Sequence, residues 1–149
     1  MKIKEKTFLW WVIFILLVVW QFPQFLVSLM MMPFLGKLRL IASRHFNFAW
    51  SGEKMRGGIS LGPFAFLSEW KAGKPEYIAH EVDGHTVDSK IFGPLYLLVI
   101  GIPSILNAIF DFTECYFSWY PEKWANRHAG LVVDEYCRLH FADPEPKNP

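Results

Sequence analysis

The chain is poor in charged side chains. Lys, Arg, Asp and Glu make up only 19% of its 149 residues, and the formal net charge is +1. This balance excludes a broad basic surface for DNA or RNA, and no stretch interleaves basic with aromatic residues as nucleic-acid-binding modules do. We therefore expect no nucleic-acid partner. The length suits a single domain, which we place at residues 1–142.

Cysteine is also scarce. The sequence contains only Cys115 and Cys137, and they form no Cys-x-x-Cys pair. Free cysteines are often buried in the packing of a protein, so we interpret both as packing residues, with a disulfide between them as the alternative. Neither interpretation fixes the redox compartment.

Apolar side chains dominate instead, with 52% hydrophobic residues, 14 Phe and 7 Trp. The longest apolar run extends from Phe8 to Leu35, and only the polar group at 21–24 interrupts it. Such a run exceeds the ~20 residues that cross a bilayer, and no small-x-small cleavage site follows its lysine-bearing start. We therefore predict an uncleaved transmembrane helix over residues 8–35, kinked near Pro23, rather than a buried helix of a soluble protein.

Turn and capping signals divide the rest of the chain. Residues 57–66 alternate apolar with small residues around a Gly-Pro pair, which predicts a short hairpin. Proline and glutamate in the first turn start a helix over residues 75–92, and Gly93-Pro94 ends it. Residues 93–112 are apolar but contain glycine, proline and asparagine, which favours a kinked or re-entrant membrane helix.

The C-terminal part is predicted to contain one helix over residues 121–139. Residues 143–149 are rich in proline and charge, which is typical of a disordered tail. Together these elements predict a mainly α, integral-membrane fold whose single membrane-embedded domain covers residues 1–142.

Residues 80–85, His-Glu-Val-Asp-Gly-His, nearly spell the His-Glu-x-x-His signature of zinc peptidases. In that signature two histidines one helical turn apart hold zinc, and the glutamate is the base for a metal-bound water. Here one additional residue separates His80 from His85, and at about 100° per residue this spacing puts them roughly 140° apart on a regular helix. They can share one ion only if the helix is locally distorted, and we expect Gly84 to permit a one-residue bulge. Glu81 is then the candidate base.

A third ligand is needed, because a catalytic zinc usually has three protein ligands and one open position. Glu122 and Asn126 lie four residues apart, so they share one helix face. In the glutamate-ligand class of zinc peptidases, a Glu-x-x-x-Asp segment supplies the third ligand and a carboxylate behind a histidine. We therefore expect Glu122 to be the third zinc ligand and Asn126 to be a neutral hydrogen-bond partner of a histidine.

Two alternatives remain for the same helix. Glu81, His85 and Asp88 share one face of an undistorted helix and can hold a harder metal, with His80 pointing elsewhere. In the other alternative no metal binds, and Glu81 and His85 form a polar pair inside an apolar protein.

The order of these parts resembles a family of small bacterial integral-membrane proteins that carry a metallopeptidase-like His-Glu-x-Gly-His motif. The shared segments are Trp-Gln-x-Pro-Gln at 20–24, Gly-x-Ser-Leu-Gly at 58–62, the motif helix, Gly-x-Leu-Tyr-Leu at 93–97, Gly-Ile-Pro-Ser at 101–104 and Glu-Lys-Trp-Ala at 122–125. Two departures are the second residue between Glu81 and Gly84, and Asn126 in place of aspartate. The longer spacing is similar to the His-Glu-x-x-Gly-His motif of dipeptidyl peptidase III, which holds zinc on a distorted helix.

This resemblance implies a protein of the bacterial inner membrane, in contact with membrane lipid. Combined with the motif, it predicts a membrane-bound zinc peptidase or amide hydrolase whose substrate is a peptide, a lipoprotein or a lipid amide. We expect residues 58–66 to present an edge strand to an extended peptide. The alternative is a non-catalytic membrane scaffold or metal-binding protein that has lost peptidase chemistry. The sequence predicts no oligomeric state.

Overall fold

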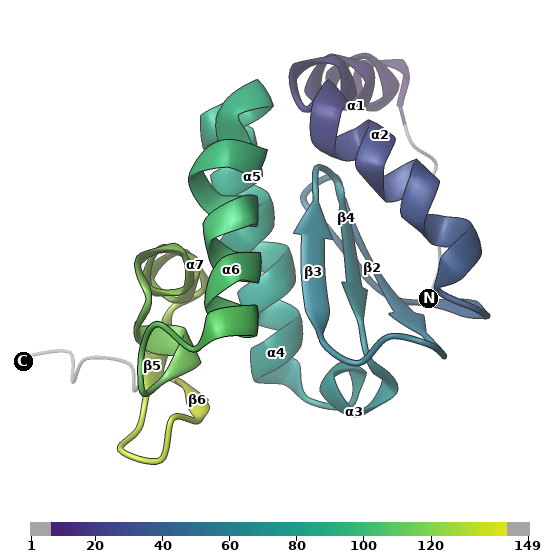
Figure 1. The fold of residues 1–149 in the computed structure, drawn as a ribbon. Coiled ribbons are helices and arrows are strands. Elements are labelled where there is room, and N and C mark those ends of the chain that lie inside the picture. The colour runs from purple at the N-terminus through teal and green to yellow at the C-terminus, as the bar shows by residue number, and fades with distance from the viewer. Residues whose placement is uncertain (1–6, 143–149) are drawn as a thin grey trace, which may run out of the picture.

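A four-stranded sheet with helices on both sides forms the body of the protein in a computed structural model (Figure 1). The structure describes residues 7–142, so the predicted disordered tail at 143–149 lies outside the described residues. The fold is mixed α/β, with 58% of the residues helical, 20% in strands and two separate sheets. The prediction of a mainly α fold is therefore wrong.

Helical segments precede and follow the four strands of the larger sheet, and two short strands come last. The helical elements are α1 (Phe8–Trp20), α2 (Phe22–Met31), η1 (Met32–Phe34), α3 (Glu69–Ala72), α4 (Pro75–Ala79), η2 (His80–His85), α5 (Thr86–Phe92), η3 (Gly93–Leu95), η4 (Leu97–Gly101), α6 (Ile102–Phe110), η5 (Tyr116–Ser118) and α7 (Tyr120–Ala129). The strands are β1 (Leu38–Arg44), β2 (Asn47–Gly52), β3 (Gly58–Leu61), β4 (Phe64–Leu67), β5 (Leu131–Val133) and β6 (Leu139–Phe141).

The larger sheet has the strand order β1-β2-β4-β3. Strands β2 and β4 are parallel, and the other two pairings are antiparallel. The predicted hairpin at 57–66 is present as β3 and β4, joined at Gly62, whose φ of +64° suits the Gly-Pro turn. Strand β3 therefore forms one edge of the sheet, and Val82 of the motif helix packs on the sheet against Ala49, Ala65 and Leu67.

The predicted transmembrane helix over residues 8–35 is wrong, because the chain breaks at Gln21 and turns by 90° between α1 and the following helical segment. Proline at position 23 follows the break and starts α2. Both glutamines of the interruption are fully buried inside the protein. Gln24 donates from its Nε2 to Ser89 Oγ (3.1 Å) and to the carbonyl of Gly93 (2.7 Å), so the polar group fixes the bend by contacts with α5.

Within residues 7–142, no single helix is both long enough and apolar enough to cross a membrane. Two pairs of consecutive helical segments, each pair sharply bent in the middle, are long and apolar enough when their two segments are taken together. They are residues 8–20 with 22–34, and residues 75–95 with 97–110, the second pair bent by 119°. The predicted kink in the 93–112 segment lies at the second bend, where Pro94 and the left-handed Gly93 (φ +49°) separate α5 from η4.

The C-terminal helix is shorter than the predicted range of 121–139. It ends at Ala129, because Gly130 adopts the left-handed conformation (φ +65°) that closes helices. The chain then forms the small antiparallel hairpin β5–β6, which packs with Ala79 and Phe117 in a second apolar cluster. No sequence pattern had indicated this hairpin.

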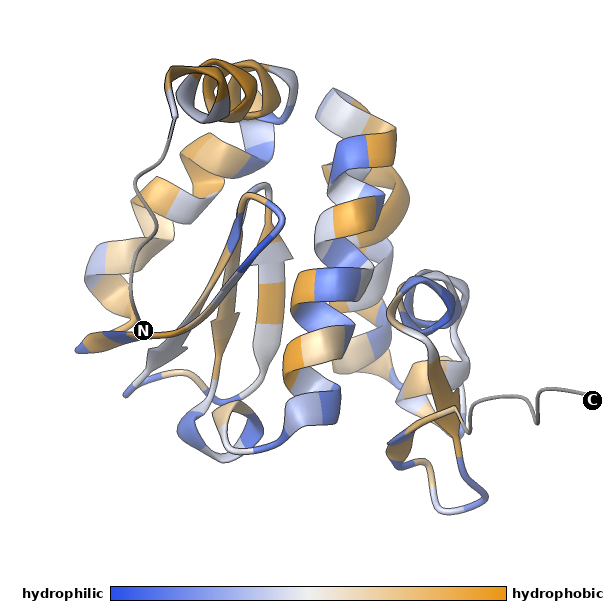
Figure 2. Cartoon of the chain, turned by 180° about the vertical axis from the view of Figure 1, so that it is seen from behind, coloured by the Kyte–Doolittle hydropathy of each residue, from blue (hydrophilic) through white to orange (hydrophobic). Residues whose placement is uncertain are grey.

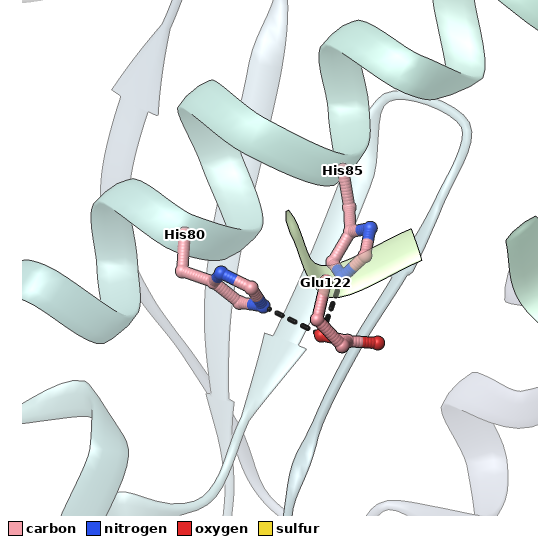
Figure 3. Close-up of side chains that lie close together, drawn as sticks. All are labelled: His80, His85 and Glu122. Carbon is pink, nitrogen blue, oxygen red and sulfur yellow. Dashed lines mark hydrogen bonds and ion pairs between the residues drawn. The ribbon is translucent and has the colours of Figure 1, made fainter. Parts of the chain in front are cut away.

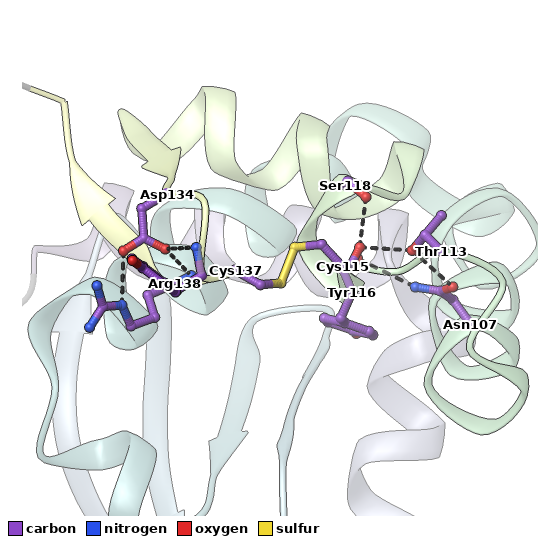
Figure 4. Close-up of a disulfide and its surroundings, with 9 residues drawn as sticks. Asn107, Thr113, Cys115, Tyr116, Ser118, Asp134, Cys137 and Arg138 are labelled. Atoms are coloured by element: carbon purple, nitrogen blue, oxygen red, sulfur yellow. Dashed lines mark hydrogen bonds and ion pairs between the residues drawn. A yellow bond between two sulfur atoms is a disulfide. The ribbon is translucent and has the colours of Figure 1, made fainter.

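The two cysteines form a disulfide, so their interpretation as free packing residues is wrong (Figure 4). Their Cα atoms are 5.5 Å apart, and 22 residues separate them in sequence. Cys115 lies before α7 and Cys137 lies in the turn of the hairpin after it, so the bond closes a loop that contains the whole of α7. The carbonyl of Cys115 also accepts hydrogen bonds from the hydroxyls of Thr113 and Ser118 (2.7 Å each).

We predict that the double change Cys115→Ser and Cys137→Ser lowers the free energy of unfolding by about 3 kcal/mol, because a closed loop of this length restricts the unfolded chain. Urea unfolding of the oxidised protein and of the double variant measures the difference. Reductant should destabilise the parent protein by a similar amount and leave the variant unchanged. Equal stability of the two proteins would contradict the prediction.

Candidate metal centre

The motif residues 80–85 form one turn of π-helix, η2, inside the continuous helix made by α4, η2 and α5. A π-helix has i→i+5 hydrogen bonds, so residues five apart lie on the same face, as residues four apart do in an α-helix. The bulge predicted from the spacing is therefore present. It brings His80 and His85 to one side of the helix, with their rings 4.8 Å apart between centroids.

Polar side chains of the sheet stabilise this irregular turn. Asn47 of β2 donates from Nδ2 to the carbonyl of Val82 (3.1 Å) and to Thr86 Oγ1 (2.7 Å). Ser60 of β3 places its hydroxyl 3.1 Å from the carbonyl of Glu81. A π-turn disturbs the regular backbone pairing of a helix, and buried carbonyls without partners are costly. Asn47 and Ser60 therefore support the distortion that the metal site needs, and sequence reasoning had assigned a role to neither.

Gly84 lies inside the π-turn and is also needed for packing. A Cβ at this position would lie 2.6 Å from the carbonyl oxygen of Ala125 in α7. Only glycine allows the two helices to approach this closely. Because Glu122 and Asn126 flank Ala125 on α7, the close approach carries both of them to the histidines.

The carboxylate of Glu122 lies between the two imidazoles (Figure 3). Its Oε2 is 3.0 Å from His80 Nε2 and 3.2 Å from His85 Nε2, and all three side chains are buried. Ligands 2.0–2.1 Å from a tetrahedral ion such as zinc are about 3.3 Å from one another. The two distances from the carboxylate to the imidazoles are close to this value, the three ligand atoms lie within 4.8 Å of one another, and this group can hold a metal ion.

Each ligand is held from behind by another side chain. Asn126 Oδ1 is 2.8 Å from His80 Nδ1, and the carboxylate of Asp88 is 3.5 Å from His85 Nδ1. Ser104 donates its hydroxyl to Glu122 Oε1 (2.5 Å). A partner that accepts from Nδ1 fixes the tautomer and leaves the Nε2 lone pair for a metal, which is the usual arrangement of metal-binding histidines.

The electrostatics of the group also suit a cation. Burial lowers the pKa of His85, but the carboxylate of Glu122, with those of Asp88 and Glu81, raises it to about 10. Burial raises the pKa of Glu122, and the two histidines lower it well below the usual value. The raised pKa favours a proton on His85 in the metal-free protein. This proton lies between two carboxylates, where a metal ion can bind.

The predicted base, Glu81, points to the edge strand β3. Its Oε2 accepts a hydrogen bond from Ser60 Oγ (2.7 Å), and a Cβ on Gly58 would lie 2.0 Å from its Oε1. Glycine at 58 is thus required for the carboxylate to pack against the strand. Glu81 and His85 both line a cavity of about 310 Å³ that borders the strand. The candidate base and one candidate ligand therefore face the same cavity, which is large enough for solvent.

Three further residues at this cavity were not found from the sequence. Ser104, the partner of Glu122, is also 2.8 Å from the hydroxyl of Tyr116, and Tyr96 donates its hydroxyl to the carbonyl of Ser60 (2.9 Å). Burial, followed by the charge of Glu122, raises the pKa of Tyr116, so its phenol stays protonated. Ser104 belongs to the Gly-Ile-Pro-Ser segment and Tyr96 to the Gly-x-Leu-Tyr-Leu segment, but no signal in the sequence marks Tyr116.

The alternative metal set of Glu81, His85 and Asp88 is not assembled. Asp88 lies on the Nδ1 side of His85, opposite to Glu122, whereas Glu81 is engaged with β3. Among residues 7–142, the three that can share an ion are His80, His85 and Glu122. Asp88 also lies 3.0 Å from His128 Nδ1, so His128 belongs to the surroundings of the site.

Comparison with known proteins adds no family assignment. No family model, no curated protein and no solved structure matches the chain. The resemblance to small bacterial membrane proteins therefore stays a prediction.

We predict that Asn126→Asp increases zinc affinity by about tenfold and that Asn126→Leu decreases it by 10–100-fold. Aspartate raises the basicity of His80 and removes the buried Nδ2, for which the described residues provide no hydrogen-bond partner. Leucine removes the acceptor that holds the ring. Competition with a chromogenic chelator measures both constants. Equal affinities for all three proteins would exclude His80 as a ligand.

Zinc affinity should also depend on pH. Because the pKa of His85 in the metal-free protein is about 10, zinc must displace a proton at neutral pH, so apparent affinity should rise about tenfold per unit between pH 7 and 9. The raised pKa of His85 also stabilises the metal-free fold. This stabilisation is complete at pH values below 6.5, the pKa of His85 in the unfolded chain, and is lost as the pH rises through about 10. Isothermal titration in buffers of different ionisation enthalpy counts the protons released, and release of none would contradict the prediction.

Proposed function

We propose that the protein is a membrane-associated, zinc-dependent hydrolase of amide bonds, with His80, His85 and Glu122 as the zinc ligands and Glu81 as the base. The observation that carries the proposal is the convergence of three buried ligand atoms, with Asn126 at hydrogen-bond distance from Nδ1 of His80 and the carboxylate of Asp88 3.5 Å from Nδ1 of His85. Two histidines and one glutamate are a ligand set of catalytic zinc, which leaves a position open.

The surrounding residues support hydrolysis. When bound, zinc is a Lewis acid for the scissile carbonyl and makes a water molecule acidic enough to attack it. Glu81, which borders the cavity, accepts the proton of the attacking water and returns it to the leaving amine. Asn126, Asp88 and Ser104 keep the ligands in place.

Strand β3 supports an extended peptide as the substrate. Leu61 and Phe64 flank the two-residue turn, so Gly58 and Ser60 direct their backbone groups away from β4. The contact of Tyr96 with the carbonyl of Ser60 agrees with this direction. An edge strand beside a base offers backbone hydrogen bonds that align a peptide across the site.

Location in the bacterial inner membrane is part of the proposal, on the grounds of the apolar sequence and its resemblance to membrane proteins. The disulfide supports an oxidising environment for the site, because such bonds persist outside the cytoplasm. We therefore place α7 and the metal site on the outer side of that membrane.

A second candidate is a metal-binding protein without hydrolytic activity. The neutral amide of Asn126, where a carboxylate is expected, favours it, because an amide raises the basicity of His80 less than a carboxylate does. This candidate keeps the three ligands and differs only in the absence of turnover.

We predict that Glu81→Gln keeps bound zinc at one ion per chain but lowers kcat/KM for apolar fluorogenic peptides by roughly 10²–10⁴-fold. Glu69→Gln, which removes the same charge from exposed Glu69 in α3, is the matched control and should behave as wild type. Metal analysis of the detergent-purified proteins accompanies the assay. Unchanged turnover in Glu81→Gln removes Glu81 from the role of base.

The wild-type protein separates the two candidates. Zinc bound without cleavage of any peptide in the set favours the non-catalytic metal protein. A wild-type protein that takes up no zinc when it is supplied contradicts both candidates.

A further inference from the structure

Two bent helical pairs expose large apolar side chains. In the first pair, α1 and the α2–η1 segment, the most exposed are Phe8, Leu9, Val19, Met30 and Phe34, each at least 64% exposed. Figure 2 shows α1 mainly in the hydrophobic colour. In the second pair, the exposed residues from the 91–110 segment are Ile91, Leu95, Leu98, Ile102, Ile105, Leu106, Ile109 and Phe110. Many exposed apolar side chains on two segments of a protein mark an interaction site.

The distribution of charge along the chain indicates what covers this surface. Residues 7–36 contain no charged side chain, and neither do residues 91–110. Lys6 and Lys37 flank the first segment, whereas Lys90 precedes the second and Asp111 follows it. Uncharged apolar helices are complementary to the hydrocarbon of a bilayer, and the lysines on both sides of the first segment are complementary to its anionic headgroups. A soluble protein partner would instead be expected to require hydrogen-bonding groups within the surface.

The cavity at the candidate metal centre borders the same surface. Its lining includes Val27 and Met31 from α2 and Ile102, Ile105 and Ala108 from α6. Ile102 and Ile105 are also 47% and 46% exposed, so they belong to the cavity wall and to the outer apolar surface together. Figure 1 shows α2 and α6 on the two sides of β3, which borders the cavity between them.

We propose that a bilayer containing anionic lipid covers both apolar helical pairs and that substrate enters the cavity between α2 and α6 from the bilayer. The substrate class is a peptide chain anchored in the membrane, with apolar residues next to the cleaved bond. The apolar cavity wall takes these residues, and strand β3 aligns the backbone. The substrate part rests on the proposed function, whereas the bilayer part does not.

The first experiment measures co-flotation of the detergent-purified protein with vesicles of phosphatidylcholine and phosphatidylglycerol. Leu98→Gln with Ile109→Gln removes two exposed apolar side chains that do not line the cavity, and should lower the vesicle partition constant by at least about tenfold. Val132→Gln with Phe141→Gln removes similarly exposed side chains from the β5–β6 hairpin and should have no effect. Vesicles without phosphatidylglycerol should bind the parent protein more weakly.

The second experiment compares one apolar peptide with and without a palmitoyl anchor, in the presence of these vesicles. We expect kcat/KM to be at least tenfold higher for the anchored form. The double variant Leu98→Gln with Ile109→Gln should lose this preference but keep its zinc and its rate on the unanchored peptide.

Equal vesicle partition of the two double variants, or the formation of oligomers in place of vesicle binding, would overturn the bilayer surface. Equal rates on both peptides would overturn substrate entry. Loss of zinc or of all turnover would refute the proposed function but not the bilayer surface, because the flotation experiment requires neither zinc nor turnover.

Discussion

The π-helical turn at residues 80–85 is the constraint on which the rest of the site depends. In a regular helix, one histidine would face away from α7 and the extra residue would abolish a shared ligand position. In the π-turn, the two histidines face Glu122, Val82 faces the sheet and Glu81 faces β3. One distortion thus directs two side chains of the turn to α7 and two others to the four-stranded sheet. The sheet supports it in return, through the amide of Asn47 and the hydroxyl of Ser60.

The site concentrates negative charge on buried side chains. Glu81, Asp88 and Glu122 are each at most 4% exposed, and they surround two buried histidines. Burying ionised groups without compensation costs several kcal/mol each. In the described protein the compensation is a proton on His85, which the raised pKa expresses. A divalent cation at the same point neutralises more charge than one proton does, so the arrangement of carboxylates favours exchange of proton for metal.

Some parts of this architecture could be predicted from the sequence because they depend on local chemistry. The π-bulge and the pairing of the motif with Glu122 and Asn126 follow from residue spacing, and the hairpin turn follows from Gly62 and its proline. Strands β1 and β2 could not be found in this way. Their residues form neither an apolar run nor a regular alternation. In addition, the parallel partner of β2 is β4, which lies in a later part of the chain.

The wrong prediction of a spanning helix has an equally physical origin. Composition reports how apolar a segment is but does not report where it bends, and 28 residues of low charge satisfy the length criterion whether straight or folded. The bend is set by tertiary contacts of Gln24 with Ser89 and Gly93, which belong to the other bent pair. These same contacts hold the two pairs together above the cavity. Because a buried amide with two hydrogen bonds is costly to separate, the polar interruption of the apolar run is what joins α2 to the second bent pair, and both contribute apolar side chains to the cavity.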